Sequence, residues 1–262
     1  MSRPPFEIAG TRIAAGTTGV VDLPVSILPD HTPVHMSVKV HHGKRPGPTM
    51  FVSAAVHGDE VIGVEIVRRL LRAPQLSSLR GTLLVVPVVN SFGFLNRSRY
   101  LPDRRDLNRC FPGTPSGSLG SRLAHLFLHE IVMRCDFGID LHSAAIHRTN
   151  LPQCRITPGD KITAKMARDF GAPVLLYEAG EGLRFDEFAV RAGVAGILRV
   201  LRAQDMLPAK GIAKSKSSSL ICKGSHWLRA PAGGLLRTFR DTGEVVEKGD
   251  VLAAVSDPFG HV

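Results

Sequence analysis

Three side chains of types that commonly ligate zinc follow predicted strands. His57 and Glu60 stand three positions apart directly after the apolar run 49–56, and His142 follows the short apolar run 137–141. In a helical turn, a spacing of three places two side chains on the same side. Two histidines and one carboxylate leave one coordination position open, as a catalytic zinc requires. An HxxE pair also arises by chance, and His57 taken alone is more typical of a structural or surface histidine.

The elements that must position these side chains form an alternating series of strands and helices. The alternation of apolar and polar residues over 34–40 predicts a half-buried strand, and the apolar runs 49–56 and 82–89 predict buried strands. Short strands are predicted over 137–141 and 174–177, and helices over 60–73, 119–131, 161–170 and 185–203, with Ser116 or Ser118 capping the second helix. The pattern predicts an α/β fold with a mainly parallel or mixed sheet, flanked by helices, that binds ligands at the carboxyl ends of its strands.

Composition excludes several classes of protein. Among the 262 residues, 44% are apolar and 21% are charged, which is typical of a globular protein and excludes a disordered chain. The longest apolar stretch, 83–89, is too short to span a bilayer, and the N-terminus lacks the apolar core of a signal peptide. The net charge is +10, but with one Trp and two Tyr there is little to stack bases. We therefore expect a cytoplasmic protein that binds neither nucleic acid nor membrane.

Composition changes after Leu207, which predicts a second, smaller part of the chain. Residues 208–225 are polar, basic and rich in serine, as in a linker. Short β-like pieces separated by glycines follow, at 227–229, 234–239 and 250–255. We predict a main domain over 1–207, a linker over 208–225 and a small β appendage over 226–262. The four cysteines form no CxxC pair, which favours a reduced protein over a disulfide framework.

Five motifs occur in an order that resembles a known family. They are VHGDE at 56–60, NSFGFLNRSRY at 90–100, DLNRCFPG at 106–113, DFGIDLHS at 136–143 and LLYEAGE at 175–181. This set resembles the zinc-dependent carboxypeptidase clan and, within it, the succinylglutamate desuccinylase/aspartoacylase family of deacylases. The resemblance implies a zinc-carboxypeptidase-like catalytic domain over 1–207, and it makes the end of the chain similar to the family's small β-barrel-like appendage.

The resemblance also implies roles for individual residues. His57, Glu60 and His142 match the ligands of one zinc ion per chain, and Glu178 matches the glutamate that acts through the zinc-bound water. Asn108 and Arg109 match the pair that holds the substrate carboxylate, which a guanidinium can grip with two hydrogen bonds. Arg99 matches the arginine that polarises the scissile carbonyl. Arg105 is the alternative to Arg99, Glu181 is the alternative to Glu178, and His147, Arg148 and Asn150 are further candidates for lining the pocket.

The implied reaction is zinc-dependent hydrolysis of the amide bond of an N-acyl amino acid, and a basic pocket suits a small acidic substrate. Only 36 residues separate His142 from Glu178 (178 − 142 = 36), fewer than the family normally has, and the appendage is also short. The missing length leaves two alternatives open. They are a peptidase of the same clan and a catalytically impaired zinc-binding protein. Missing strands can also expose a sheet edge, which allows a homo-oligomer.

Overall fold

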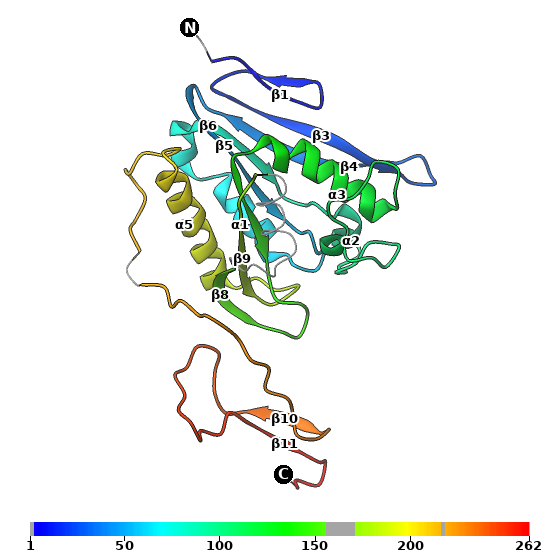
Figure 1. Cartoon of the computed structure of the whole chain (residues 1–262), viewed down its shortest axis with the longest axis vertical. Helices are drawn as coiled ribbons and strands as arrows, with labels where there is room; N and C mark the ends of the chain where they lie inside the picture. The colour runs from blue at the N-terminus through cyan, green and yellow to red at the C-terminus, as the bar shows by residue number, and fades with distance from the viewer. Residues whose placement is uncertain (1–2, 156–170, 216–217, 262) are drawn as a thin grey trace. The chain divides into compact units, whose positions relative to one another are not determined.

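The computed structural model describes residues 3–155, 171–215 and 218–261 (Figure 1). The chain divides into two compact units, 1–213 and 214–262. The strands of the first unit are β1 (Phe6–Ile8), β2 (Thr11–Ile13), β3 (Thr17–Ile27), β4 (Pro33–His42), β5 (Arg45–Ala54), β6 (Arg80–Val86), β7 (Phe137–His142), β8 (Asn150–Arg155) and β9 (Val174–Gly180). Among its described residues, its helices are α1 (Ile62–Leu70), α2 (Ser91–Leu95), α3 (Leu119–Glu130) and α5 (Glu187–Ala203), with 3₁₀ turns η1 (Pro74–Ser78), η2 (Leu107–Arg109) and η3 (Val132–Arg134).

A seven-stranded mixed sheet organises the first unit. Its strand order among the described residues is β3-β4-β6-β5-β7-β9-β8. The central strands β6, β5, β7 and β9 pair in parallel, whereas β3, β4 and β8 pair antiparallel at the two sides. Parallel strands end at the same edge of a sheet, so the loops that follow β5, β7 and β9 emerge together. The predicted α/β fold with a mixed sheet is confirmed.

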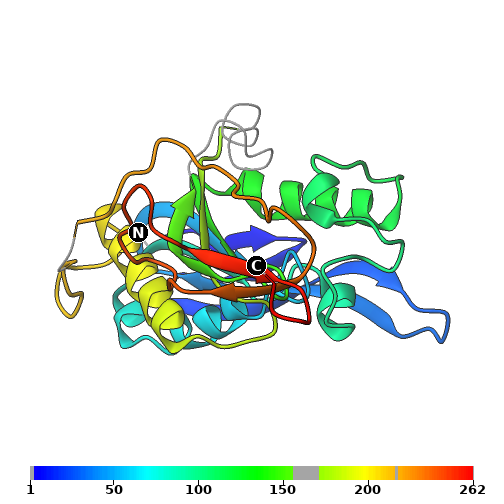
Figure 2. The ribbon, with the colours of Figure 1, turned by 90° about the horizontal axis from the view of Figure 1, so that it is seen from below.

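Helices cover both faces of this sheet. Helices α1 and α5 contact each other and pack with the inner strands around one apolar core, which includes Met50, Ile66, Leu141 and Ile197. Helix α3 lies on the other face over a second core with Phe51, Leu84 and Phe127 (Figure 2). Full burial of a side chain of this size stabilises the fold by about 1.5–3 kcal/mol. The two cores hold the central strands from both sides and thereby fix the positions of their carboxyl ends.

The structure agrees with most predicted elements and adds several. The strands expected near 34–40, 49–56, 82–89, 137–141 and 174–177 and the helices near 60–73, 119–131 and 185–203 are all present within a few residues. Ser118, not Ser116, caps α3, because its side chain accepts a hydrogen bond from the Ser121 N–H. The predicted helix 161–170 lies outside the described residues. Strands β1, β2, β3 and β8 are additions that the sequence pattern does not predict.

The second unit contains one small antiparallel sheet, formed by β10 (Leu235–Thr238) and β11 (Ala253–Ser256). These strands overlap two of the three pieces expected there, 234–239 and 250–255. The third piece, 227–229, is not a strand: Trp227 is 85% exposed, and this stretch pairs with no strand of the described residues. Residues 208–213, which composition assigns to a linker, belong to the first unit: Gln75 donates to the Gly211 carbonyl, and Arg199 donates to the Ala213 carbonyl.

None of the helices in the described part of the chain is long and apolar enough to cross a membrane.

Candidate metal centre and active site

The turn between β5 and α1 carries two of the three predicted zinc ligands. Ala55 leaves the strand with a positive φ of 52°, and the Glu60 N–H donates to the His57 carbonyl, so a tight turn precedes the helix. Gly58 stands inside this turn against α2. A Cβ at Gly58 would lie 1.8 Å from the backbone carbon of Gly93, so no larger residue fits. The close approach of the Gly58 and Gly93 backbones and the left-handed conformation of Ala55 therefore determine the path of the chain after β5.

His57, Glu60 and His142 form a compact buried group, which we call the His–Glu–His cluster. One ligand atom from each lies within 4.8 Å of the other two. His57 Nδ1 is 2.7 Å from Glu60 Oε1, and His142 Nδ1 is 2.7 Å from Glu60 Oε2. All three residues are at most 2% exposed. The spacing of three between His57 and Glu60 and the position of His142 after β7 thus bring three possible metal ligands together.

Each imidazole of the cluster is oriented by a second carboxylate. His142 Nε2 is 2.8 Å from Asp140 Oδ2, and His57 Nε2 is 3.1 Å from Asp106 Oδ1. The Ser53 hydroxyl donates to the other oxygen of Asp140 at 2.7 Å. A carboxylate that accepts the Nε2 proton favours the tautomer with its lone pair on Nδ1 and fixes the orientation of the ring, as in carboxylate–histidine–zinc sites. Both Nδ1 atoms face the Glu60 carboxylate at 2.7 Å, and once deprotonated they could ligate a metal ion.

The charges around the cluster shift the pKa values of Glu60 and His142 in the direction opposite to the effect of burial. Burial would raise the pKa of Glu60, but the imidazoles of His142 and His57 hold that pKa well below its usual value. Burial would lower the pKa of His142, but the carboxylates of Asp140 and Glu60 raise it well above its usual value. Glu60 is therefore ionised near neutral pH, and an ionised carboxylate is the form that ligates a metal.

The residues present fit a divalent zinc ion. Nitrogen from two histidines and oxygen from one carboxylate are ordinary zinc donors, and three protein ligands leave a fourth position for reactants. The oriented Nδ1 atoms and the buried, ionised Glu60 supply the donor chemistry that this ion prefers.

The structure places Arg99 beside the cluster and Arg105 away from it. Arg99 Nη1 lies 3.2 Å from Glu60 Oε1, and its Nη2 lies 3.1 Å from Asp106 Oδ2. The Arg105 side chain is 60% exposed and pairs with Asp103 at 3.6 Å. Of the two arginines that the sequence left open, Arg99 is thus the one that contacts the cluster.

Asn108 and Arg109 lie on the short turn η2, which Asp106 connects to the cluster. Asp106 accepts a hydrogen bond from the Asn108 N–H at 2.8 Å while it also contacts His57. The Asn108 Oδ1 atom is buried with no hydrogen-bond partner among the described residues, and the Arg109 side chain is exposed. Burial raises the pKa of Asp106, but the nearby His57 and Arg99 hold it well below its usual value. An ionised Asp106 therefore links η2, Arg99 and His57.

Glu178 lies next to the cluster through the sheet itself. On the parallel strands β7 and β9, Glu178 is the register partner of His142. Directly paired residues on neighbouring strands project their side chains from the same face. Glu181, its alternative, instead accepts from the His147 N–H and pairs with Arg184 in the loop after β9. The shortened chain between His142 and Glu178 therefore still brings Glu178 to the strand end that carries the cluster.

Asp106 and Asp140 are site residues to which the sequence alone assigned no role. Asp140 precedes His142 by two residues in a strand, and this spacing puts both side chains on one face. The spacing of two residues could therefore have identified Asp140 as a neighbour of His142 from the sequence. The contact between Asp106 and His57 spans 49 residues of chain and has no local signal.

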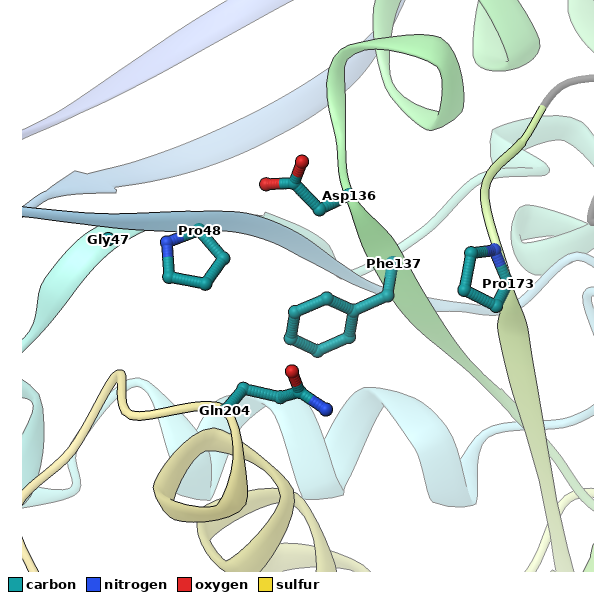
Figure 3. A pocket seen from close by; sticks show the side chains of 6 residues that line it. All are labelled: Gly47, Pro48, Asp136, Phe137, Pro173 and Gln204. Carbon is teal, nitrogen blue, oxygen red and sulfur yellow. The ribbon is translucent and has the colours of Figure 1, made fainter.

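A separate hollow of about 420 Å³ lies at the opposite end of the strands (Figure 3). Its lining residues are Gly47, Pro48, Asp136, Phe137, Pro173 and Gln204. They stand at or near the beginnings of β5, β7 and β9 and the end of α5, whereas the cluster stands at the carboxyl ends of β5 and β7. The carboxylate of Asp136 accepts a hydrogen bond from the Thr49 N–H. The chemistry described above therefore does not use this hollow.

A relative of assigned activity is a deacetylase. The chain is 29% identical over 155 residues to the N-alpha-acetyl-L-2,4-diaminobutyric acid deacetylase of Halomonas elongata. The match covers 56% of this chain and 45% of that enzyme, so the chain spans about half the length of its curated relative.

Solved structures and the family comparison agree with each other. A succinylglutamate desuccinylase from Silicibacter sp. TM1040 aligns with a TM-score of 0.79 at 22% identity, over 92% of this chain and 83% of that one. A succinylglutamate desuccinylase/aspartoacylase from Rhodobacter sphaeroides aligns with a TM-score of 0.77 at 25% identity, over the same shares of the two chains. Residues 46–198, more than half of the chain, match the succinylglutamate desuccinylase/aspartoacylase catalytic domain. The chain therefore belongs to the succinylglutamate desuccinylase/aspartoacylase family.

Proposed function

We propose that this protein is a zinc-dependent deacylase that hydrolyses the amide bond of a small N-acyl amino acid. The observation that carries the proposal is the pairing of His142 with Glu178 at the end of β7 and β9. It supports the proposal because it brings a carboxylate, a group that can transfer protons, next to three converging side chains that could hold a metal ion. Family membership supports the deacylase class, because relatives in this family remove acyl groups.

His57, Glu60 and His142 would hold the zinc ion. When bound, the ion supplies a Lewis acid that polarises the substrate carbonyl and makes water more acidic. Glu178 takes a proton from the attacking water and returns it to the nitrogen that leaves. The guanidinium of Arg99, already beside Glu60, donates to the carbonyl oxygen as negative charge develops there.

Asn108 and Arg109 would bind the carboxylate of the substrate. The exposed Arg109 offers a planar fork of donors, which matches the two oxygens of a carboxylate. Holding the carboxylate fixes the amide relative to Glu178 and Arg99, so less entropy is lost in the reaction step. The net charge of +10 also favours an acidic substrate over a basic one.

The direct pairing of His142 and Glu178 favours an active enzyme over an impaired zinc-binding protein. A peptidase of the same clan is the second alternative, and it differs in the product rather than in the site. Incubation with N-acyl amino acids and with short peptides, followed by mass spectrometry of the products, distinguishes the two. A deacylase releases free amino acid and acyl acid from the first set only.

The primary test combines metal analysis with activity. We expect about one zinc per purified chain and almost none in the His57→Ala/His142→Ala double variant. Glu178→Gln is expected to keep the zinc and to lower kcat by about 10²–10⁴-fold, since it removes the proton acceptor. A wild-type chain that takes up no zinc after reconstitution would rule out the proposed function.

A further inference from the structure

The geometry points to Asn150 and Arg155 on strand β8 as positioning residues that hold the carboxylate of Glu178 for proton transfer. This inference rests on the proposed deacylase function and assigns a task to the antiparallel strand at the end of the described sheet. The Asn150 amide donates to Glu178 Oε2 at 3.1 Å, and Arg155 Nη2 lies 3.2 Å from the same oxygen. Two donors thus converge on one oxygen from opposite directions along β8.

A β-bulge in β8 makes this convergence possible. Gln153 pairs with Glu178, and Asn150 pairs with Gly180, so three steps along β8 match two steps along β9. Without the extra residue, Leu151 would face Gly180 and the Asn150 side chain would project from the other face of the sheet. The bulge therefore re-aims Asn150 onto the face of Glu178. Pro152 lies inside the irregular stretch, where a missing backbone donor is tolerated.

Arg155 reaches Glu178 from the other side of the same face. It pairs with Leu176, two residues before Glu178 on β9, and so lies diagonally across from the glutamate. Its side chain is 47% exposed, whereas that of Glu178 is 14% exposed. The arginine therefore extends from the surface to a carboxylate that is largely covered.

These two contacts restrict the flexible side chain of Glu178, whose carboxylate must be positioned accurately for proton transfer. A glutamate has three rotatable side-chain bonds, and proton transfer requires its carboxylate within hydrogen-bond reach of the reacting proton. A displacement of about 1 Å can lower a rate about 100-fold. Donors fixed on a strand that pairs with β9 limit the rotation of the carboxylate relative to His142, since all three strands belong to one sheet.

The test is a double-mutant cycle on purified, zinc-loaded protein with the best N-acyl amino acid substrate. Asn150→Ala and Arg155→Gln are each expected to lower kcat about 10-fold, with KM changed less than about twofold and zinc content unchanged. Arg155→Lys, which keeps a charged donor, is expected to recover part of the loss. In the Glu178→Gln background, either substitution is expected to change the residual rate less than about twofold.

Stability provides a readout that does not depend on activity. The Tm shifts of Arg155→Gln and Glu178→Gln should be non-additive in the double variant, because the second change removes a contact that the first has already broken. Arg68→Gln is the matched control: Arg68 is 50% exposed and pairs with Glu65 on α1, so its loss should leave kcat unchanged.

The outcomes separate this inference from the proposed function. A wild type without deacylase activity would overturn both. If the wild type is active but the β8 substitutions raise KM, or lower kcat equally with and without Glu178, only the positioning role is overturned. Arg155 would then be assigned to direct substrate contact.

Discussion

The His–Glu–His cluster and the segment 96–116 lie side by side but are built in opposite ways. Every member of the cluster is at most 2% exposed and has a defined polar partner. The segment 96–116 contains only the short turn η2, and its Arg109 side chain is exposed. The two regions meet at Asp106, which contacts His57 and accepts from the Asn108 N–H, and at Arg99, which contacts Glu60.

The difference indicates that metal binding and substrate binding depend on different parts of this fold. The cluster is fixed by strands that two apolar cores hold from both faces, so its geometry is set by folding itself. The segment 96–116 buries Leu101 and Leu107 in one of these cores, but its exposed positions, such as Arg109, can change with little cost to the core. We therefore expect substitutions in the cluster to affect metal binding and stability, and substitution of the exposed Arg109 to affect substrate binding alone.

The largest expected effect comes from Gly58→Ala, which tests whether the turn of the cluster tolerates any movement. Its Cβ would collide with the backbone of Gly93, so the turn or α2 must shift. We expect a loss of about 3 kcal/mol in the free energy of unfolding, together with loss of zinc. Chemical denaturation and metal analysis measure the two effects.

Gly196→Ala is the matched control for that substitution. Gly196 lies in α5, and a Cβ added there would meet no described atom within 4 Å beyond the backbone of its own helix. Alanine should therefore raise stability by about 0.5–1 kcal/mol. A Gly58→Ala protein that kept its zinc and its stability would show that the turn adapts, and the contrast between the two regions would weaken.

A smaller effect on the cluster is expected from Asp140→Asn, a substitution of the carboxylate that contacts His142. The change keeps the shape of the side chain but removes the charge that orients the His142 ring. We expect zinc affinity to fall about 10–100-fold, as for other carboxylates behind a metal-ligating histidine. Competition with a zinc chelator measures the affinity. An unchanged affinity would mean that His142 is held by packing alone.

The segment 96–116 is tested by Arg109→Lys. Lysine keeps the charge but loses the fork that binds both carboxylate oxygens. We expect KM to rise about 10-fold, with zinc content unchanged and stability within about 0.5 kcal/mol of wild type, because the side chain is exposed. Arg122→Lys on α3 is the control. A loss of zinc or a large loss of stability in Arg109→Lys would remove the distinction between the two regions.

The same contrast explains what could be predicted from the sequence. The central strands and the three cluster residues carry local signals: continuous apolar runs, and ligand types directly after them. Strand β8 carries none, because the residues NLPQCR contain no alternating or continuous apolar pattern, and its partner β9 begins 19 residues after β8 ends (174 − 155 = 19). The positions of Arg99 and Asp106 depend on contacts between distant segments, which no local pattern encodes.

The smallest expected effect comes from Glu65→Gln on α1, which tests how far the cluster depends on the ion pairs of this helix. The Glu65 side chain is 10% exposed. Hydrogen bonds from Arg68 and Arg69 hold the pKa of Glu65 at about 2. An unfolded glutamate has a pKa of about 4.3. Because the folded pKa is lower, this network stabilises the fold fully above about pH 4.3 and loses that effect as the pH falls toward about 2.

We therefore expect Glu65→Gln to lower Tm at pH 7 by less than about 3 °C, with a difference from wild type that shrinks as the pH falls through that window. Thermal unfolding between about pH 2 and pH 7 measures it, and Glu7→Gln controls for the loss of one exposed carboxyl group. Zinc content and kcat/KM should not change, because Glu65 pairs with Arg68 and Arg69 and not with a residue of the cluster. A Glu65→Gln protein that lost zinc would show that α1 transmits surface charge to His57 and Glu60, and then the cluster would not be set by the buried strands alone.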